Sequence, residues 1–219
     1  MTSPVPMASG RDADVYALDV HRVLRRYRDG VDATAEAAVM GYLGALGYPV
    51  PHVHSVDHAD MVLERLHGPT MLQALTTGQL DPHAGARQLA GLQTRLHALP
   101  PRTSTDPRSR VLHGDLHPDN VVLTARGPVV IDWRNTTEGP PELDVALSAV
   151  ILAQTAVGDA GDLAGLARAF LTAFLTHSGP LAMLAEATST RRGDPNLSEA
   201  EINRLDQAAS LIEVLAKDS

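Results

Sequence analysis

The chain has 219 residues, and its 26 acidic and 18 basic side chains give a formal net charge of −8 at pH 7. This length suits one two-lobed unit or two small domains, and it is sufficient to bury a hydrophobic core. The acidic balance argues against a nucleic acid as the main partner, and the absence of cysteine excludes a disulfide framework and a thiolate metal site.

No segment has the features of a targeting signal or a membrane span. Residues 1–10 lack the basic start and the apolar centre of a signal peptide. The most apolar later stretch, residues 145–157, contains Ser148, Gln154 and Thr155 and is shorter than the roughly 20 residues that a bilayer requires. We therefore expect a soluble cytoplasmic protein without a membrane partner.

The amino-terminal stretch predicts short strands around a glycine turn. Gly10 is a candidate for a turn that covers phosphate, although little room is left for a strand before it. A further strand is predicted at residues 22–28. Because side chains alternate along a strand, Arg25 lies on the same face as Val23 and Tyr27. The alternative is that residues 22–28 form an edge strand whose arginines are only solvated and bind no ligand.

A helix is predicted from residue 33 to residue 46, with Asp32 as its amino-terminal cap and Gly47 at its end. Glu36 lies in the first turns of this helix. An acidic residue is favoured there by the helix dipole alone, so its position does not by itself indicate a function.

Two more strands are predicted at residues 51–56 and 61–66. His52 and His54 alternate on one face of the first. Without a third ligand nearby, they are better interpreted as exposed strand histidines than as a metal site.

The rest of the chain is predicted to be mainly helical. Asp81 caps a helix with Pro82 at its first position, and Leu89, Leu92, Leu96 and Leu99 form one apolar face. Further helices are predicted at residues 142–157, 163–176 and 198–216, the last opened by a capping box from Ser198 to Glu201. Residues 191–195 are predicted to be a loop. It could reach the acceptor site, but a plain connecting loop is the favoured interpretation.

The most informative stretch begins at residue 111. His113, Asp115 and Asn120 have the spacing of a phosphotransferase catalytic loop. In such a loop an aspartate meets the acceptor hydroxyl, and an asparagine five residues later holds a metal ion. The sequence therefore predicts a kinase active site here.

A hairpin is predicted directly after this loop, because short apolar runs at residues 121–123 and 129–131 flank a turn. A hairpin returns the chain toward Asn120. Asp132, which follows it, is the second candidate metal ligand, since Mg²⁺ prefers oxygen donors.

These residues resemble the aminoglycoside phosphotransferase and choline kinase family of small-molecule kinases. The resemblance rests on His113-Gly114-Asp115-Leu116-His117-Pro118-Asp119-Asn120, Ile131-Asp132-Trp133 and Gly139-Pro140-Pro141-Glu142-Leu143-Asp144. It implies an α+β, two-lobed, protein-kinase-like fold, with a small β-rich lobe at residues 1–66 and a mainly helical lobe at residues 67–219. The aspartate that matches Asp144 braces the catalytic loop in this family.

The resemblance also implies ATP and Mg²⁺ as cofactors. Asp115 is then the catalytic residue, and Asn120 and Asp132 hold the metal. Arg25, with Arg26 as the close alternative, replaces the strand lysine that contacts phosphate, because the only lysine of the chain is Lys217.

Three further positions receive roles in nucleotide binding from the resemblance. Glu36 is expected to orient the strand arginine, and Gly10 is expected to lie in the turn over the phosphates. The backbone of Glu64 and Leu66, in the segment that links the lobes, is expected to hold adenine.

The expected reaction is transfer of the ATP γ-phosphoryl group to a hydroxyl of a small molecule. Residues 133–219 hold 12 acidic and 6 basic side chains, against 14 and 12 in residues 1–132. Where this family binds its acceptor, the chain is thus acidic, which favours a cationic, amine-bearing acceptor. Acidic residues that only solvate helix faces are the alternative.

Two other hypotheses remain open at this point. One is a non-catalytic nucleotide-binding protein that keeps the kinase fold. The other is a zinc hydrolase that uses His113, Asp115 and His117, which alternate along the chain. A protein kinase is disfavoured because no Ala-Pro-Glu follows Asp132.

Overall fold

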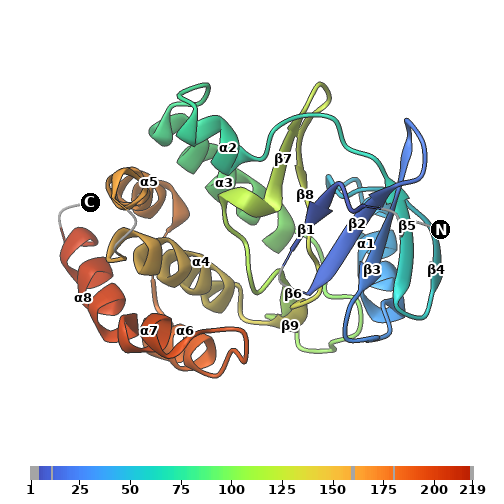
Figure 1. The fold of residues 1–219 in the computed structure, drawn as a ribbon. Coiled ribbons are helices and arrows are strands. Elements are labelled where there is room, and N and C mark those ends of the chain that lie inside the picture. Colours follow the sequence, from blue (N-terminus) through green and yellow to red (C-terminus); the bar gives the residue numbers. More distant parts are fainter. Residues whose placement is uncertain (1–4, 11, 159–160, 180, 218–219) are drawn as a thin grey trace. The chain divides into compact units, whose positions relative to one another are not determined.

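The computed structural model describes residues 5–10, 12–158, 161–179 and 181–217 (Figure 1). They form two compact units. The first contains the chain up to residue 68 together with residues 122–136, and the second contains residues 69–121 and the chain from residue 137 onward. The predicted division at residue 66 differs mainly in residues 122–136, which the sequence assigns to the helical lobe.

The first unit is built on an antiparallel sheet of five strands in the order β1-β2-β3-β5-β4. The strands are β1 (Ala8–Ser9), β2 (Ala13–Ala17), β3 (Arg22–Tyr27), β4 (Val53–Asp57) and β5 (Asp60–Glu64). The first of them has only two residues, in line with the little room that the sequence leaves there. On β3, Val23 and Tyr27 are buried and Arg26 is exposed, as strand alternation predicts.

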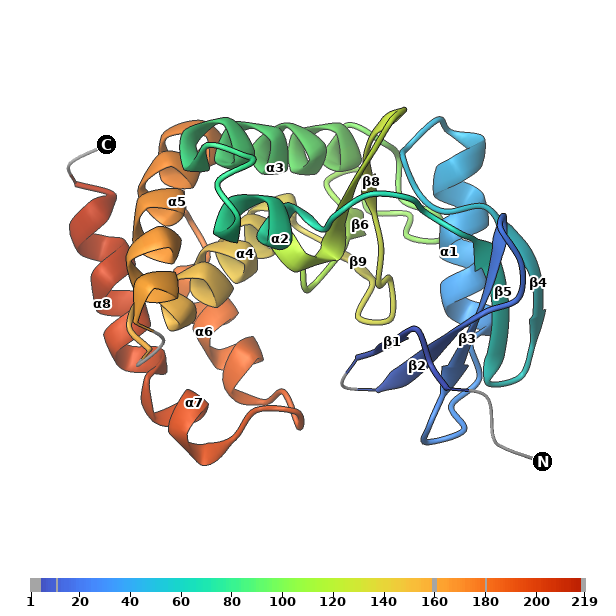
Figure 2. The same ribbon diagram turned by 45° about the horizontal axis from the view of Figure 1, so that its top comes forward.

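Helix α1 (Thr34–Ala45) packs against β4 and buries Met40 and Leu43. Figure 2 shows it running alongside the sheet. The predicted cap is wrong by one residue, because Ala33 is the cap position and has no side-chain hydrogen bond. Asp32 still serves this end by accepting the Thr34 amide at 2.8 Å. At the other end Gly47 has a φ of 78°, the left-handed conformation that glycine adopts freely.

The predicted hairpin is present as β7 (Val121–Thr124) and β8 (Gly127–Val130). It is tied to the rest of the first unit by the Val130 amide, which donates to the Pro49 carbonyl at 2.9 Å. An ion pair of 2.7 Å between Arg126 and Glu64 adds a second link. These contacts are the physical reason why the hairpin belongs with the sheet and not with the helices.

The second unit is mainly helical. Its helices are α2 (Met71–Thr76), α3 (Pro82–His97), α4 (Pro141–Ala156), α5 (Asp162–Ser178), α6 (Leu184–Arg192), α7 (Glu199–Asn203) and α8 (Leu205–Leu215). Every residue of α4 from 144 to 153 is buried, because α5, α6 and α8 all pack against it (Figure 2). A short sheet pairs β6 (Arg110–Leu112) with β9 (Thr137–Gly139).

Two predicted caps are confirmed in this unit. Asp81 accepts the Ala84 amide at 3.0 Å, and Ser198 forms the capping box with Glu201. Leu89, Leu92 and Leu96 are buried as predicted. Leu99 lies past the end of α3 and is only half-buried.

Two predictions for this unit are wrong, and one further helix was not predicted. The helix expected over residues 198–216 is divided at Arg204 into α7 and α8. Arg191 and Arg192 end α6, a helix that the sequence pattern does not reveal, instead of lying in a connecting loop. Helix α2 also escapes prediction, because its six residues are too few to show a helical period.

Within the described part of the chain, no helix combines the length and the apolar character needed to span a membrane.

Candidate active site

The catalytic loop that the sequence predicts is held by a buried carboxylate of α4. Asp144 is fully buried and accepts the Gly114 amide at 2.7 Å and the His113 amide at 3.2 Å. Its Oδ2 also lies 2.9 Å from His97 Nε2. Burial alone would raise the pKa of Asp144, but His97 and the Gly114 amide outweigh it and lower that pKa. Asp144 therefore braces the loop, as the resemblance implies.

Asp115 lies on this braced loop with its carboxylate partly open to solvent. The side chain is 21% exposed. Its Oδ2 is 3.4 Å from Asn120 Nδ2 and 3.7 Å from His117 Nε2, and its Oδ1 is 3.4 Å from Arg191 Nη1. Burial raises the pKa of Asp115, but the ring of His117 and the charge of Arg191 bring it below its ordinary value. An ionised aspartate can accept a hydrogen bond from an acceptor hydroxyl.

Asn120 closes a single 3-10 turn, Pro118–Asn120, and its side chain is directed back at the loop. The amide nitrogen donates to the Asp115 carbonyl at 2.8 Å. This bond commits the nitrogen and leaves Asn120 Oδ1 as the atom available to a cation. An amide oxygen is a ligand that suits Mg²⁺.

The first unit contains the other predicted set of residues. Arg25 Nη1 lies 2.6 Å from Glu36 Oε1, and Arg25 Nη2 lies 2.6 Å from Asp132 Oδ1. Burial alone would lower the pKa of Arg25, but the charges of Asp132 and Glu36 raise it, so the guanidinium stays charged. The structure thus brings Arg25, Glu36 and Asp132 together.

Asp132 has an unusual backbone. Its φ is 64°, in the left-handed region that residues other than glycine seldom occupy. Such conformations concentrate at functional sites. Oδ1 contacts Arg25, so Oδ2 is the carboxylate oxygen that a hard cation would use, and the side chain is 43% exposed. The oxygen donors of Asn120 and Asp132 therefore fit Mg²⁺ in their chemistry.

The other residues that are predicted to contact the nucleotide differ in whether their polar groups already have partners within the protein. Arg26 is bound to Asp60 at 2.5 Å on the exposed face of β3, so Arg25 is the better placed of the two arginines. Gly10 lies in the turn between β1 and β2, and its carbonyl accepts a hydrogen bond from Arg28. Glu64 donates its amide to the His52 carbonyl at 2.8 Å. Leu66 has no backbone hydrogen-bond partner among the residues that the structure describes.

Sequence reasoning missed a layer of side chains around Glu36. The hydroxyl of Tyr27 donates to Glu36 Oε2. Two guanidinium groups lie over the tyrosine ring, with the Cζ atom of Arg25 at 4.9 Å and that of Arg134 at 4.8 Å from the ring centroid. Arg134 also pairs with Asp29 at 2.6 Å. Tyr27, an aromatic residue at the end of an arginine-rich strand, was the sequence signal that could have indicated these contacts.

The zinc alternative finds no support in the geometry. His113 is fully buried, and its Nδ1 accepts the Asp115 amide at 3.2 Å. Within the ranges that the structure describes, no group of three or more His, Cys, Asp or Glu side chains is arranged to hold one ion. The strand histidines His52 and His54 are exposed and stack edge to face at 4.8 Å.

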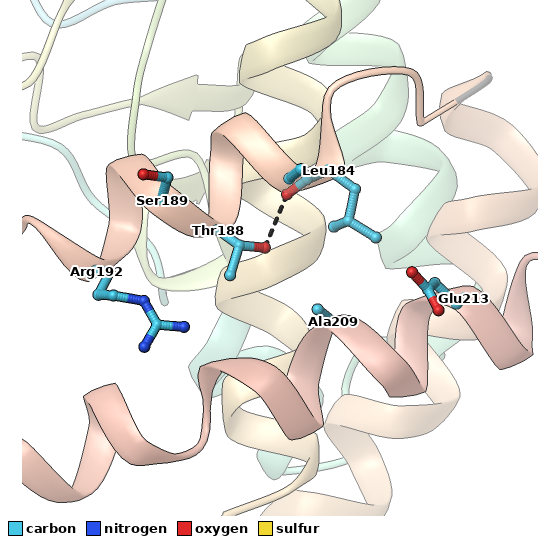
Figure 3. Close-up of a pocket in the computed structure, with 7 residues that line it drawn as sticks. Leu184, Thr188, Ser189, Arg192, Ala209 and Glu213 are labelled. Atoms are coloured by element: carbon cyan, nitrogen blue, oxygen red, sulfur yellow. Dashed lines mark hydrogen bonds between the residues drawn. The ribbon is translucent and has the colours of Figure 1, made fainter.

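A pocket of about 320 Å³ lies between α6 and α8 in the second unit (Figure 3). Arg192 and Glu213 stand at its two ends, and Thr188 lines it from α6 while donating its hydroxyl to the Leu184 carbonyl at 2.8 Å. Arg192 is bound to Asp206 at 2.6 Å. The pocket contains none of the predicted site residues.

Known structures share this fold. The streptomycin–ATP ternary complex of APH(2″)-IIa matches with a TM-score of 0.59 at 14% identity, covering 96% of this chain and 93% of that one. A choline/ethanolamine kinase family protein from Mesorhizobium loti matches with a TM-score of 0.58 at 13% identity, covering 100% and 94%. APH(3″)-Id from Streptomyces rimosus matches with a TM-score of 0.57 at 18% identity, covering 98% and 92%. The fold is therefore the α+β, protein-kinase-like fold of small-molecule kinases.

The sequence also matches the APH model, described as the phosphotransferase enzyme family, over residues 4–110 and 102–185. The chain belongs to this family. No curated protein matches it by sequence.

Proposed function

We propose that this protein is an Mg²⁺-dependent kinase that transfers the γ-phosphoryl group of ATP to a hydroxyl of a small, amine-bearing molecule. The carrying observation is the catalytic loop, where Asp144 fixes the backbone and Asn120 contacts Asp115. Catalysis of phosphoryl transfer depends on positioning the reactants and neutralising charge more than on covalent chemistry. The fixed backbone and side chains of this loop suit it to positioning.

Asp115 would accept the hydrogen bond of the acceptor hydroxyl and orient it toward the phosphorus. Because the transition state is loose, the proton leaves late, and orientation matters more than basicity. An aspartate with a pKa below its ordinary value suits this task. The proton passes to Asp115 or to water once the new P–O bond has formed.

Asn120 and Asp132 would hold Mg²⁺ through Asn120 Oδ1 and a carboxylate oxygen of Asp132. The bound cation supplies the charge that neutralises the phosphate oxygens. Asn120 and Asp132 belong to different units, so their meeting in one site is part of the proposal.

On the nucleotide side, Arg25 would contact phosphate while Glu36 keeps its guanidinium in place. The turn at Gly10 would cover the phosphates. The backbone of Leu66, together with that of Glu64, would hold adenine. The streptomycin–ATP complex of APH(2″)-IIa supports ATP as the donor and an amine-bearing acceptor.

The acidic character of residues 133–219 also supports a cationic acceptor. We expect a soluble protein of the cytoplasm, where ATP is available, without a nucleic acid or membrane partner.

The test is an ADP-formation screen with ATP and Mg²⁺ against cationic amino sugars, amino alcohols and neutral sugars. Asp115→Asn should lower turnover by roughly 10²–10⁴-fold, because it removes the group that orients the hydroxyl, while ATP binding measured by calorimetry persists. Chelation of Mg²⁺ should abolish turnover.

Two results would contradict this proposal. If Asp115→Asn forms ADP as fast as the wild type, Asp115 is not catalytic, and a nucleotide-binding protein without transfer activity becomes the better description. If a neutral sugar is the best substrate, the amine-bearing acceptor is wrong although the reaction class stands.

A further inference from the structure

Arg191, the penultimate residue of α6, is directed at the catalytic loop of the same unit. Its Nη1 lies 3.4 Å from Asp115 Oδ1, and its side chain is only 13% exposed. The two residues are 76 positions apart in the sequence. A guanidinium that is largely buried needs hydrogen-bond or ion-pair partners to offset its loss of hydration. The partners of Arg191 show how its orientation is fixed.

The guanidinium of Arg191 is fixed by two groups besides Asp115. Its Nε donates to Gln154 Oε1 on α4 at 3.0 Å, and its Nη1 donates to Asp194 Oδ2 at 2.8 Å. Gln154 is itself anchored, because its Nε2 donates to the Glu201 carbonyl at 3.3 Å. The planar guanidinium therefore has one orientation, set by α4 and by the segment after α6.

The adjacent arginine on α6 shows that this arrangement is specific. Arg192 has a side chain that is 45% exposed and pairs with Asp206 at 2.6 Å. It lines the pocket between α6 and α8 (Figure 3). Successive helical residues point about 100° apart, so only one of the two arginines can face the catalytic loop.

The carboxylate of Asp115 is held from both sides. Oδ1 contacts Arg191, and Oδ2 lies 3.4 Å from Asn120 Nδ2. Oδ2 also lies 3.7 Å from His117 Nε2. Because a carboxylate oxygen has about two lone pairs, Oδ1 can still accept one more hydrogen bond beside the one from Arg191. Contacts of 3.4 Å on both oxygens restrict rotation of the carboxylate about its terminal torsion, which is otherwise broad.

We propose that Arg191 is a positioning residue for phosphoryl transfer: it holds the Asp115 carboxylate in the orientation that receives the acceptor hydroxyl. This inference rests on the proposed function. It explains why a second-unit helix far along the chain places a largely buried cation beside the loop. A displacement of about 1 Å in such a group can change a rate by roughly 10²-fold.

The test compares Arg191→Gln with the matched control Arg192→Gln, using ATP, Mg²⁺ and the best acceptor of the wild type. Arg191→Gln should lower kcat about 10- to 100-fold with the KM for ATP nearly unchanged. Arg192→Gln should leave kcat unchanged. Arg191→Lys should be intermediate, since an ammonium keeps the charge but not the planar set of donors.

Chemical rescue separates positioning from a general structural role. In Arg191→Ala, added guanidinium ion at a concentration that does not unfold the protein should restore part of kcat, whereas a misfolded variant would not respond. No rescue, or equal kcat in Arg191→Gln and Arg192→Gln, would overturn the positioning role alone. A wild type that forms no ADP with any acceptor would overturn the proposed function, and this role with it.

Discussion

Arg25 bridges two carboxylates that a lysine could not serve in the same way. Its two terminal nitrogens each lie 2.6 Å from an oxygen, one of Glu36 and one of Asp132. A guanidinium presents several donors in a fixed plane, whereas an ammonium is a single point charge. An arginine at position 25 therefore suits the Glu36 and Asp132 carboxylates that it contacts.

We predict that Arg25→Gln destabilises the protein by up to about 3–5 kcal/mol, because it leaves the Glu36 carboxylate, 5% exposed, without its cation. Arg25→Lys should lower the free energy of unfolding by less than Arg25→Gln. The matched control is Arg26→Gln, whose ion pair with Asp60 is exposed and contributes at most about 1 kcal/mol. Urea denaturation measures all three variants. Equal losses for the Arg25→Gln and Arg26→Gln variants would show that the Arg25 pair has no special weight.

At the scale of elements, the link after β5 passes very close to β7. Gly68 has a φ of 149°, and a Cβ built there would lie 1.9 Å from the carbonyl oxygen of Leu123. No side chain fits at such a distance, and the contacted atom is backbone, which cannot rotate away. The absence of a side chain at residue 68 is what lets the link cross the hairpin.

We predict that Gly68→Ala destabilises the first unit by about 1–3 kcal/mol, since the chain must shift to relieve both the clash and the backbone strain. Gly91→Ala is the control. Gly91 lies within α3, and no atom lies within 4 Å of the position that an alanine methyl would take there. Alanine should therefore stabilise this helix by about 0.5–1 kcal/mol. Thermal melts followed by circular dichroism measure both variants. A Gly68→Ala protein that melts with the wild type would refute the close approach.

At the scale of the whole molecule, stability depends on carboxylates whose folded pKa is lowered. Glu138 accepts the amides of Arg102, Thr103 and Ser104 at 2.5, 2.9 and 2.6 Å. Burial acts to raise its pKa, but the hydrogen bonds from Thr103 and its neighbours lower it. Asp144 behaves in the same way in the interior.

We predict that the free energy of unfolding falls as the pH is lowered below about 4. Both carboxyls have folded pKa values below their unfolded ones, so their stabilisation is complete above the unfolded pKa and is lost as the pH falls through the folded pKa. Urea unfolding at a series of pH values measures this dependence.

Two variants attribute the acid dependence to a residue. Asp144→Asn should lower the free energy of unfolding by about 1–3 kcal/mol at pH 7, because the amide nitrogen that replaces one carboxylate oxygen cannot accept its loop amide, and the dependence on pH should be weaker. Asp57→Asn, at an exposed position, should change little. An Asp144→Asn protein with the pH dependence of the wild type would contradict the assignment.

The sequence alone determined the hairpin after residue 120 and the caps at Asp81 and Ser198, and it predicted the catalytic loop from His113 to Asn120. The hairpin and the caps depend on residues within a few positions of one another, where spacing and local hydrogen bonding decide the conformation. The loop is recognised by its spacing, but its backbone is held by Asp144, 30 positions after Gly114. The pairing of Arg25 with Glu36 was also predicted, because a known family has the same arrangement.

Only the tertiary structure decided which distant side chains meet. Arg191 and Asp115 are in contact across 76 positions, and Arg134 reaches Asp29 across 105. Such contacts are set by how helices and strands pack, and no local pattern encodes them. For Arg191, the sequence offered only the possibility that residues 191–195 reach the acceptor site, and this does not say which of the two adjacent arginines turns inward.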